Sequence, residues 1–184
     1  MLQDMHDGFG SQLVIAKMMV EQSQMSQVSL ARLLEETIAD LYLLVDTLGS
    51  SDNYLSNALV DFRFRTQQRL AGTPLALHWN LQVDDSPEVS PKTVLQILRL
   101  VQEALNNALK HAKANNIHLD FTYDAVKGLL TVSVADDGIG IVKQTAYGRG
   151  QKNMMARARA VGGKLSVSNS YPGTLVQMSV PLSG

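Results

Sequence analysis

The chain has 184 residues, 45% of them hydrophobic, so it is long and apolar enough to bury one core or two small ones. A net charge of −1 and a sequence pI of about 6.4 exclude the basic excess typical of direct binding to nucleic acid or an anionic membrane. The absence of cysteine excludes disulfides, thiolate metal sites and a cysteine nucleophile. We therefore expect a cytoplasmic protein whose only membrane attachment would come from a segment upstream of this sequence.

Residues 1–50 are predicted to form an antiparallel helical hairpin. Apolar residues recur there every three or four positions in two stripes, and there is no proline. The stripes are Leu2, Met5, Phe9, Leu13, Ala16 and Val20, then Leu30, Leu34, Ile38, Leu41, Val45 and Leu48. Two such helices cannot bury both wide apolar faces against each other, so we expect a homodimer in which two hairpins make a four-helix bundle. The alternative is a hairpin that packs on the rest of its own chain.

Residues 53–184 are predicted to form a second domain of α+β class, a two-layer α/β sandwich with helices on one side of a mixed sheet. A polar stretch at 49–53 marks the boundary. Helices are expected at 53–70, 91–112 and 151–161, the second beginning with the N-cap Ser90 and the first-turn Pro91. Strands are expected at 75–83, 117–123, 129–135, 164–168 and 174–180.

The stretch QEALNNALKHA at 102–112 places polar side chains on one helix face. Glu103 and Asn107 are four residues apart, as are Asn107 and His111, with Lys110 beside them. A carboxylate, an amide oxygen, an amine and an imidazole together suit a hydrated Mg²⁺ ion and the phosphates around it. A merely solvated helix face is the alternative interpretation.

Two glycine-bearing stretches follow. DDGIG at 136–140 comes directly after a strand, so Gly138 and Gly140 let the backbone approach a ligand while Asp136 can accept a hydrogen bond from an exocyclic amine. An ordinary surface turn is the alternative here. GRGQKNM at 148–154 precedes a helix, where Gly148 and Gly150 would expose N–H groups to an anion.

These three stretches, in this order, resemble the ATP-binding domain shared by sensor histidine kinases, Hsp90, gyrase B and MutL. The resemblance covers residues 53–184 and implies ATP and Mg²⁺ as cofactors. It makes Asn107 the magnesium ligand and Asp136 the residue that reads adenine. The four glycines at 138, 140, 148 and 150 would shape the nucleotide pocket and its lid.

The segment MHDGFGSQL at 5–13 resembles the phosphoacceptor motif of sensor kinases whose acceptor histidine is followed by aspartate, the subfamily of the nitrate and desaturase sensors. This resemblance makes His6 the nucleophile, and Asp7 the residue that orients it and takes its proton. Many relatives have glutamine five residues after the histidine, where it helps to dephosphorylate the partner. Here Ser11 holds that place and Gln12 follows, so phosphatase activity is less clearly implied than kinase activity.

The resemblance therefore implies the core of a sensor histidine kinase that autophosphorylates and passes the phosphoryl group to an aspartate of a response regulator. It also implies that this regulator has a LuxR-type helix-turn-helix output domain. Two alternatives remain open. One is a non-catalytic ATP-binding or dimerisation module, which would bind nucleotide without forming phosphohistidine. The other is an ATPase or serine kinase of the same fold, in which Glu103 would activate water or a hydroxyl. His78 and His118, in predicted strands, are interpreted as structural.

Overall fold

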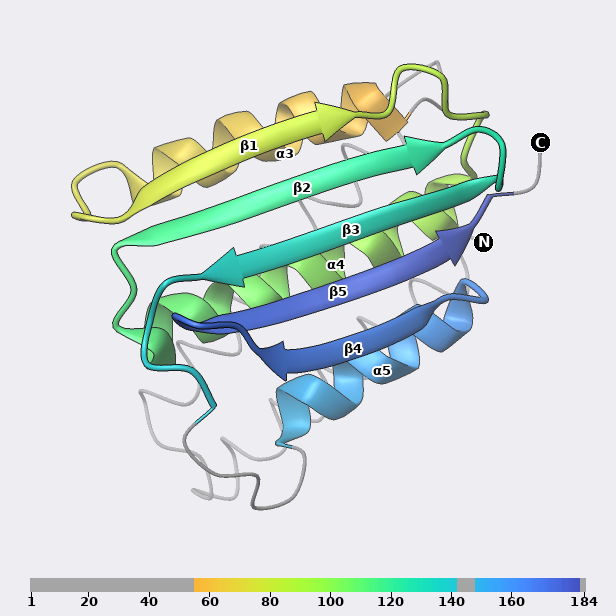
Figure 1. The fold of residues 1–184 in the computed structure, drawn as a ribbon. Helices are drawn as coiled ribbons and strands as arrows, with labels where there is room; N and C mark the ends of the chain where they lie inside the picture. Colours follow the sequence, from red (N-terminus) through yellow and green to blue (C-terminus); the bar gives the residue numbers. More distant parts are fainter. Residues whose placement is uncertain (1–54, 142–147, 183–184) are drawn as a thin grey trace, which may run out of the picture. The chain divides into compact units, whose positions relative to one another are not determined.

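A computed structural model describes residues 55–141 and 148–182, and the predicted N-terminal hairpin with its dimer lies outside them. The described part is an α+β sandwich with a five-stranded sheet (Figure 1). Its spatial order is β1 (Ala76–Gln82), β2 (Asn116–Asp124), β3 (Leu129–Asp136), β5 (Thr174–Pro181) and β4 (Lys164–Asn169). β1 is parallel to β2 and the other neighbours are antiparallel, which confirms the predicted mixed sheet.

One face of the sheet is apolar and the other polar, because successive side chains of a strand point to opposite faces. The buried face is formed chiefly by Ile117, Leu119, Phe121, Leu130, Val132, Val134, Val176, Met178 and Val180. The intervening residues of β2 and β3, such as His118, Asp120 and Ser133, lie on the outer face. This alternation fixes which side of the sheet the helices cover.

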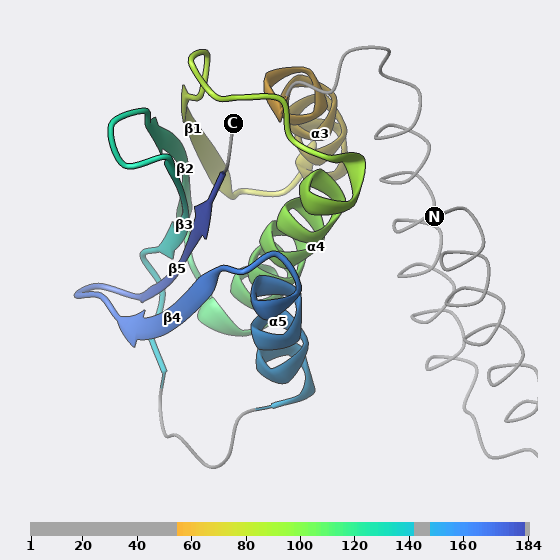
Figure 2. The same ribbon diagram turned by 90° about the vertical axis from the view of Figure 1, so that its right-hand side faces the viewer.

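Three helices cover the apolar face: α3 (Leu55–Leu70), α4 (Pro91–Asn107) and α5 (Arg149–Ala160) (Figure 2). The start of α4 is as predicted, since the backbone N–H of Thr93 donates to Ser90 Oγ at 3.2 Å and Pro91 occupies the first turn. α4 lies between α3 and α5, and its buried side chains form the centre of the core. None of the described helices is long and apolar enough to cross a bilayer.

An aromatic cluster joins α3 to the sheet. The ring of Phe62 meets Trp79 of β1 edge-on, with centroids 6.0 Å apart, and Trp79 stacks on Phe121 of β2 at 6.5 Å. Trp79 is the only tryptophan in the sequence. Its fluorescence therefore reports on the packing of this domain.

The helix predicted at 91–112 changes character before its end. α4 is regular to Asn107, and the next turn, η1 (Ala108–Ala112), is a π-helix followed by Lys113 in the left-handed conformation, with φ of 52°. The Ala112 carbonyl accepts the backbone N–H of Ile139 at 2.8 Å. The wider turn thus ties the end of this helix to the loop after β3, and π-turns of this kind are frequent at functional sites.

The helix predicted at 151–161 begins two residues earlier, at Arg149. Gly148 is its N-cap residue, and the Lys152 N–H donates to the Gly148 carbonyl at 3.1 Å. Gly150 therefore lies in the first helical turn and not in the preceding loop. The sequence pattern predicts it before the helix; in the structure a Cβ at this position would meet Oε1 of Glu103 on α4, the end of a side chain that can move.

Candidate functional site

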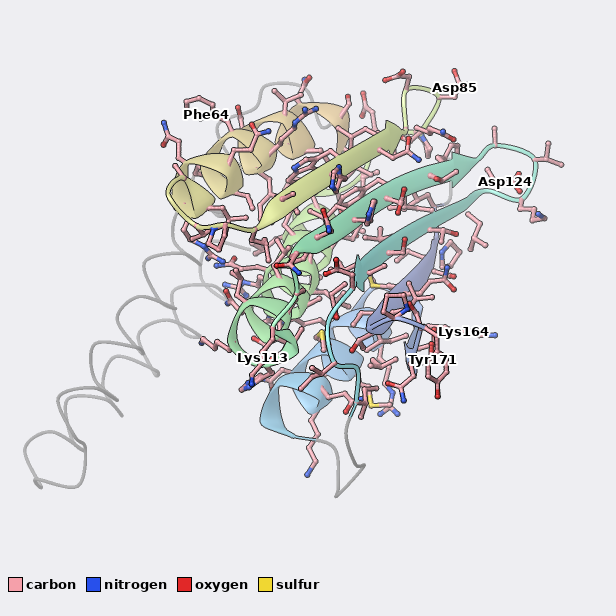
Figure 3. The ribbon with its side chains drawn as sticks, turned by 60° about the vertical axis from the view of Figure 1, so that its left-hand side comes forward. Phe64, Asp85, Lys113, Asp124, Lys164 and Tyr171 are labelled. Atoms are coloured by element: carbon pink, nitrogen blue, oxygen red, sulfur yellow. The ribbon has the colours of Figure 1, made fainter. Side chains whose placement is uncertain are left out.

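A cavity of about 440 Å³ lies where η1, the start of α5, the end of β3 and the β4–β5 hairpin meet. Figures 1 and 3 show these segments at one end of the domain, where Lys113 follows η1 and Tyr171 lies in the β4–β5 turn. The wall is mostly apolar with a few polar side chains, as is typical of small-molecule sites. It is formed by Ala104, Asn107, Ala108, His111, Ala112, Asp136, Ile139, Gly140, Ile141, Gln151, Met154, Val167, Thr174 and Val176.

Asp136, the last residue of β3, is the buried carboxylate of this cavity, with only 9% of its surface exposed. Its Oδ1 accepts the backbone N–H of Gly138 at 2.9 Å and that of Thr174 at 3.3 Å. Its Oδ2 has no hydrogen-bond partner within residues 55–141 and 148–182. Two backbone donors thus fix the carboxylate by one oxygen and leave the other to accept a hydrogen bond from a ligand.

Asp137, unlike Asp136, has both carboxylate oxygens bonded within the protein, so its role is structural. Its Oδ1 accepts the backbone N–H groups of Asn115 and Asn116, both at 2.8 Å, and its Oδ2 accepts Asn116 Nδ2 at 2.7 Å. These donors, those of Asn116 first, hold the pKa of Asp137 below its usual range because they favour the charged form. Asp137 therefore anchors the start of β2 to the chain just after Asp136, at the end of β3.

This anchoring predicts a pH dependence. Because the pKa of Asp137 is lower in the folded chain than in the unfolded one, its contribution to stability is present above about pH 4 and is lost as the pH falls through the folded pKa. We expect the urea midpoint of the wild type, followed by Trp79 fluorescence, to fall more between pH 6 and pH 3 than that of Asp137→Asn. Equal falls in the two proteins would show that Asp137 has no such role.

Gly138 packs directly against η1. A Cβ at this position would overlap the carbonyl oxygen of Ala112, the same group that accepts the Ile139 N–H. Only glycine permits this approach, which closes one side of the cavity. The π-turn supplies the Ala112 carbonyl, and the glycine allows the loop after β3 to pack directly against it.

The β4–β5 turn holds the other side of the loop. Asn169, the last residue of β4, accepts the backbone N–H of Ile141 through Oδ1 at 2.6 Å. The same oxygen would lie 2.9 Å from a Cβ at Gly140, whose φ is +69°. Gly173 packs so closely on the Asp136 backbone that a Cβ there would overlap the Asp136 carbonyl. The hairpin thus sets the path of the chain from Asp136 to Ile141.

Removing the Asn169 acceptor is therefore expected to loosen the cavity. Asn169→Ala leaves the Ile141 N–H without its partner, and we expect binding of the nucleotide that the sequence resemblance implies to weaken about fivefold, or ~1 kcal/mol. Asn169→Asp keeps an acceptor oxygen and is the matched control. Titration calorimetry with ADP measures both, and wild-type affinity in Asn169→Ala would contradict this role.

The α4 side of the cavity presents Asn107, whose side-chain amide has no hydrogen-bond partner within the described ranges. One turn earlier, Glu103 faces α5, and a Cβ at Gly150 would overlap its Oε1. This close approach brings the first turn of α5 beside Asn107. Gly148 provides no side-chain cap, so the first N–H groups of α5 remain available to an anion.

The predicted site residues can now be placed. Asn107, His111, Asp136 and Gly140 line the cavity, whereas Gly138, Gly150 and Glu103 are not among its lining residues and make the contacts just described. Lys110 is exposed and is not a lining residue. It lies in the π-helical turn η1, where residues three apart no longer share a face as they do in an α-helix. Gly148 is exposed at the start of α5. His6, Asp7 and Gln12 lie outside the described residues, as does the predicted lid at 142–147.

Sequence reasoning missed most of the apolar wall and the whole contribution of the hairpin. The apolar lining residues Ile139, Met154, Val167 and Val176 have no chemistry that distinguishes them from core residues in the sequence. Thr174 and Asn169 carry no motif. The one available signal was the Pro-Gly turn at 172–173, which predicts that the residues flanking it lie at the end of a hairpin.

The donor set fits an adenine nucleotide with Mg²⁺. Apolar side chains suit a flat base, Asp136 Oδ2 can accept an exocyclic amine, and the start of α5 suits phosphates. Among the described residues no three His, Asp or Glu side chains could hold a metal ion together. A magnesium ion would therefore be held by phosphates and water, with the Asn107 amide oxygen as its protein ligand.

Comparison with known families agrees with this fit. Residues 93–184, half of the chain, match the family described as histidine kinase-, DNA gyrase B-, and HSP90-like ATPase. The sensor histidine kinase YxjM of Bacillus subtilis is 28% identical over 195 residues, which cover 98% of this chain and 46% of YxjM. The nitrate/nitrite sensor protein NarQ of Escherichia coli is 39% identical over 88 residues, which cover 46% of this chain and 15% of NarQ. The chain thus spans less than half the length of these two relatives.

Among solved structures, the histidine kinase domain of the Erythrobacter litoralis EL346 blue-light activated histidine kinase has a similar fold. The TM-score is 0.68 at 22% sequence identity, and the match covers 94% of this chain and 83% of that domain. At this identity the likeness concerns the fold alone. The matches together confirm the resemblance seen in the sequence motifs.

Proposed function

Because this chain belongs to the histidine kinase-, DNA gyrase B- and HSP90-like ATPase family, we propose that it is the core of a sensor histidine kinase. In this proposal the cavity binds Mg-ATP, His6 accepts the terminal phosphoryl group, and an aspartate of a response regulator receives it next. The observation that carries the proposal is the Asp136 carboxylate, buried and fixed by one oxygen while the other is left without a donor in the described structure.

The cavity residues act mainly by position. Asp136 Oδ2 accepts the exocyclic amine of adenine, which selects adenine over a base with a carbonyl oxygen at that place. The apolar side chains of Ile139 and Met154 exclude water from the faces of the base. The amide oxygen of Asn107 and the N–H groups of α5 hold the metal and phosphate end, where phosphoryl transfer needs positioning and charge neutralisation most.

The acceptor half of the reaction belongs to the N-terminal segment. Bound ATP supplies the phosphoryl group when its terminal phosphate meets the acceptor. A neutral imidazole nitrogen of His6 forms the new bond to phosphorus, ADP is released, and Asp7 takes the imidazole proton. Gln12 would position water for the opposing phosphatase activity, in which the phosphoryl group on the regulator is hydrolysed to inorganic phosphate. Glu103, turned towards Gly150, helps to fix the α4–α5 contact around the phosphates.

The proposed cellular setting follows from the same family. We propose a homodimer built on the hairpin at 1–50, with the catalytic domain at 53–184. The partner is the receiver domain of a response regulator with a LuxR-type output. The chain acts in the cytoplasm, and a membrane anchor would be supplied only by an upstream segment.

The test is incubation with Mg²⁺ and ATP labelled on the γ-phosphate. We expect protein-bound label that is acid-labile and alkali-stable, as phosphohistidine is, and that disappears in both His6→Gln and Asn107→Ala. Label that persists in His6→Gln would reject His6 as the acceptor. Nucleotide binding without any label would favour the non-catalytic ATP-binding module instead.

A further inference from the structure

Two histidines lie together on the polar face of the sheet. The proposed kinase reaction gives neither of them a role. His78 of β1 and His118 of β2 are directly paired in the parallel register, and both side chains are exposed. Their rings stack with centroids 4.5 Å apart and planes within 16° of each other. Two imidazoles are therefore presented to solvent side by side.

A chain of hydrogen bonds fixes the ring of His78. The carboxylate of Asp137 can only accept, so Asn116 turns its Nδ2 group towards it, at 2.7 Å from Oδ2. The Oδ1 of Asn116 must then face His78, whose Nε2 lies 3.2 Å away. An amide oxygen can only accept, so Nε2 of His78 carries the hydrogen. The lone pair of the neutral ring is consequently on Nδ1.

This is how proteins orient a metal-binding histidine: one ring nitrogen donates to a fixed acceptor and the other is left to the metal. His118 has no hydrogen-bond partner among the described residues, so its ring can turn towards the same ion. Its neighbour on the other side, Ala135 of β3, is small and leaves room. Asp120, two positions along β2 on the same face, adds a negative charge about 7 Å away.

We propose that His78 and His118 together bind one divalent transition-metal ion, such as Ni²⁺, Zn²⁺ or Cu²⁺, through one imidazole nitrogen each. Imidazole suits these ions and not Mg²⁺. Two bonds of ~2.1 Å at a tetrahedral angle place the nitrogens roughly 3.4 Å apart. Because each lone pair lies in the plane of its ring, the His118 ring must turn out of the stack to reach an ion bound to His78. Water completes the coordination, so the ion exchanges readily.

The experiment is a titration of the untagged, chelator-treated chain with Ni²⁺, followed by Trp79 fluorescence. Trp79 follows His78 on β1, so an open-shell ion at the pair lies close enough to quench it. Calorimetry with Zn²⁺ gives the stoichiometry, expected to be one ion at this site. His78→Gln and His118→Gln are each expected to weaken binding at least about tenfold, whereas Asp124→Asn, at the end of β2, keeps it.

Absence of quenching in the wild type at millimolar Ni²⁺ would overturn the proposal. So would equal binding by the wild type and both single variants, since the ion would then lie elsewhere. Circular dichroism of each variant confirms that the fold is retained. All these readouts use the metal alone and are independent of nucleotide binding, so they neither rest on the proposed kinase activity nor test it.

Discussion

Asp136→Asn is expected to weaken ADP and ATP binding about 100-fold, or ~2.7 kcal/mol. The substitution keeps the shape of the side chain. Its oxygen takes the place of Oδ1, because only an acceptor can satisfy the N–H groups of Gly138 and Thr174. The new NH₂ group therefore points into the cavity, where it meets the exocyclic amine of adenine donor to donor.

The same reasoning predicts a change of preference. A base with a carbonyl oxygen at that position, as in guanine, is expected to lose much less affinity, because the amide can donate to it. Titration calorimetry with ADP and GDP measures both effects. Asp124→Asn, at the end of β2 and at the other end of the domain (Figure 3), is the matched control and should bind as the wild type does. Unaltered ADP affinity in Asp136→Asn would contradict the assignment of this residue.

Gly138→Ser is expected to lower both stability and nucleotide affinity. Its Cβ would overlap the Ala112 carbonyl oxygen, so the loop must move away from η1 and carry the Gly138 N–H away from Asp136. Such overpacking costs about 2 kcal/mol, or roughly 4–8 °C in Tm for a chain of this size. Thermal unfolding followed by Trp79 fluorescence gives the Tm.

Gly148→Ser is the matched substitution for comparison. A Cβ at Gly148 would meet nothing within 4 Å, and serine is a favourable N-cap residue, so its Tm should be unchanged or slightly raised. If both serine variants unfolded at the wild-type temperature, the contact between Gly138 and η1 would not constrain the fold.

Much of the described fold follows from local pattern. All five strand ranges lie within one residue of their predicted bounds, because alternation and turn residues are local signals. Asp136 and Asn107 line one cavity, and the motif around each combines a polar side chain with residues that pack closely nearby. Gly138 is the clearest case, since its overlap with Ala112 explains why no other residue fits.

The rest depends on contacts that no local pattern contains. Lys110 was grouped with Asn107 by α-helical spacing, but the π-turn at 108–112 is held by a bond from Ile139, which is distant in sequence. Asn169 reaches the loop after Asp136 only through the register of the β4–β5 hairpin. The stacking of His78 on His118 likewise requires the parallel pairing of strands separated by the whole of α4.

The central claim is that the cavity beside η1 is the nucleotide site, and mapping of backbone amide chemical shifts during titration with Mg-ADP tests it most directly. The account predicts that the largest shifts fall on residues 107–112, 136–141 and 174, and that they are absent in Asp136→Asn at the same concentration. Saturable shifts centred elsewhere, such as on the outer face of the sheet, would contradict it, as would the absence of any saturable shift.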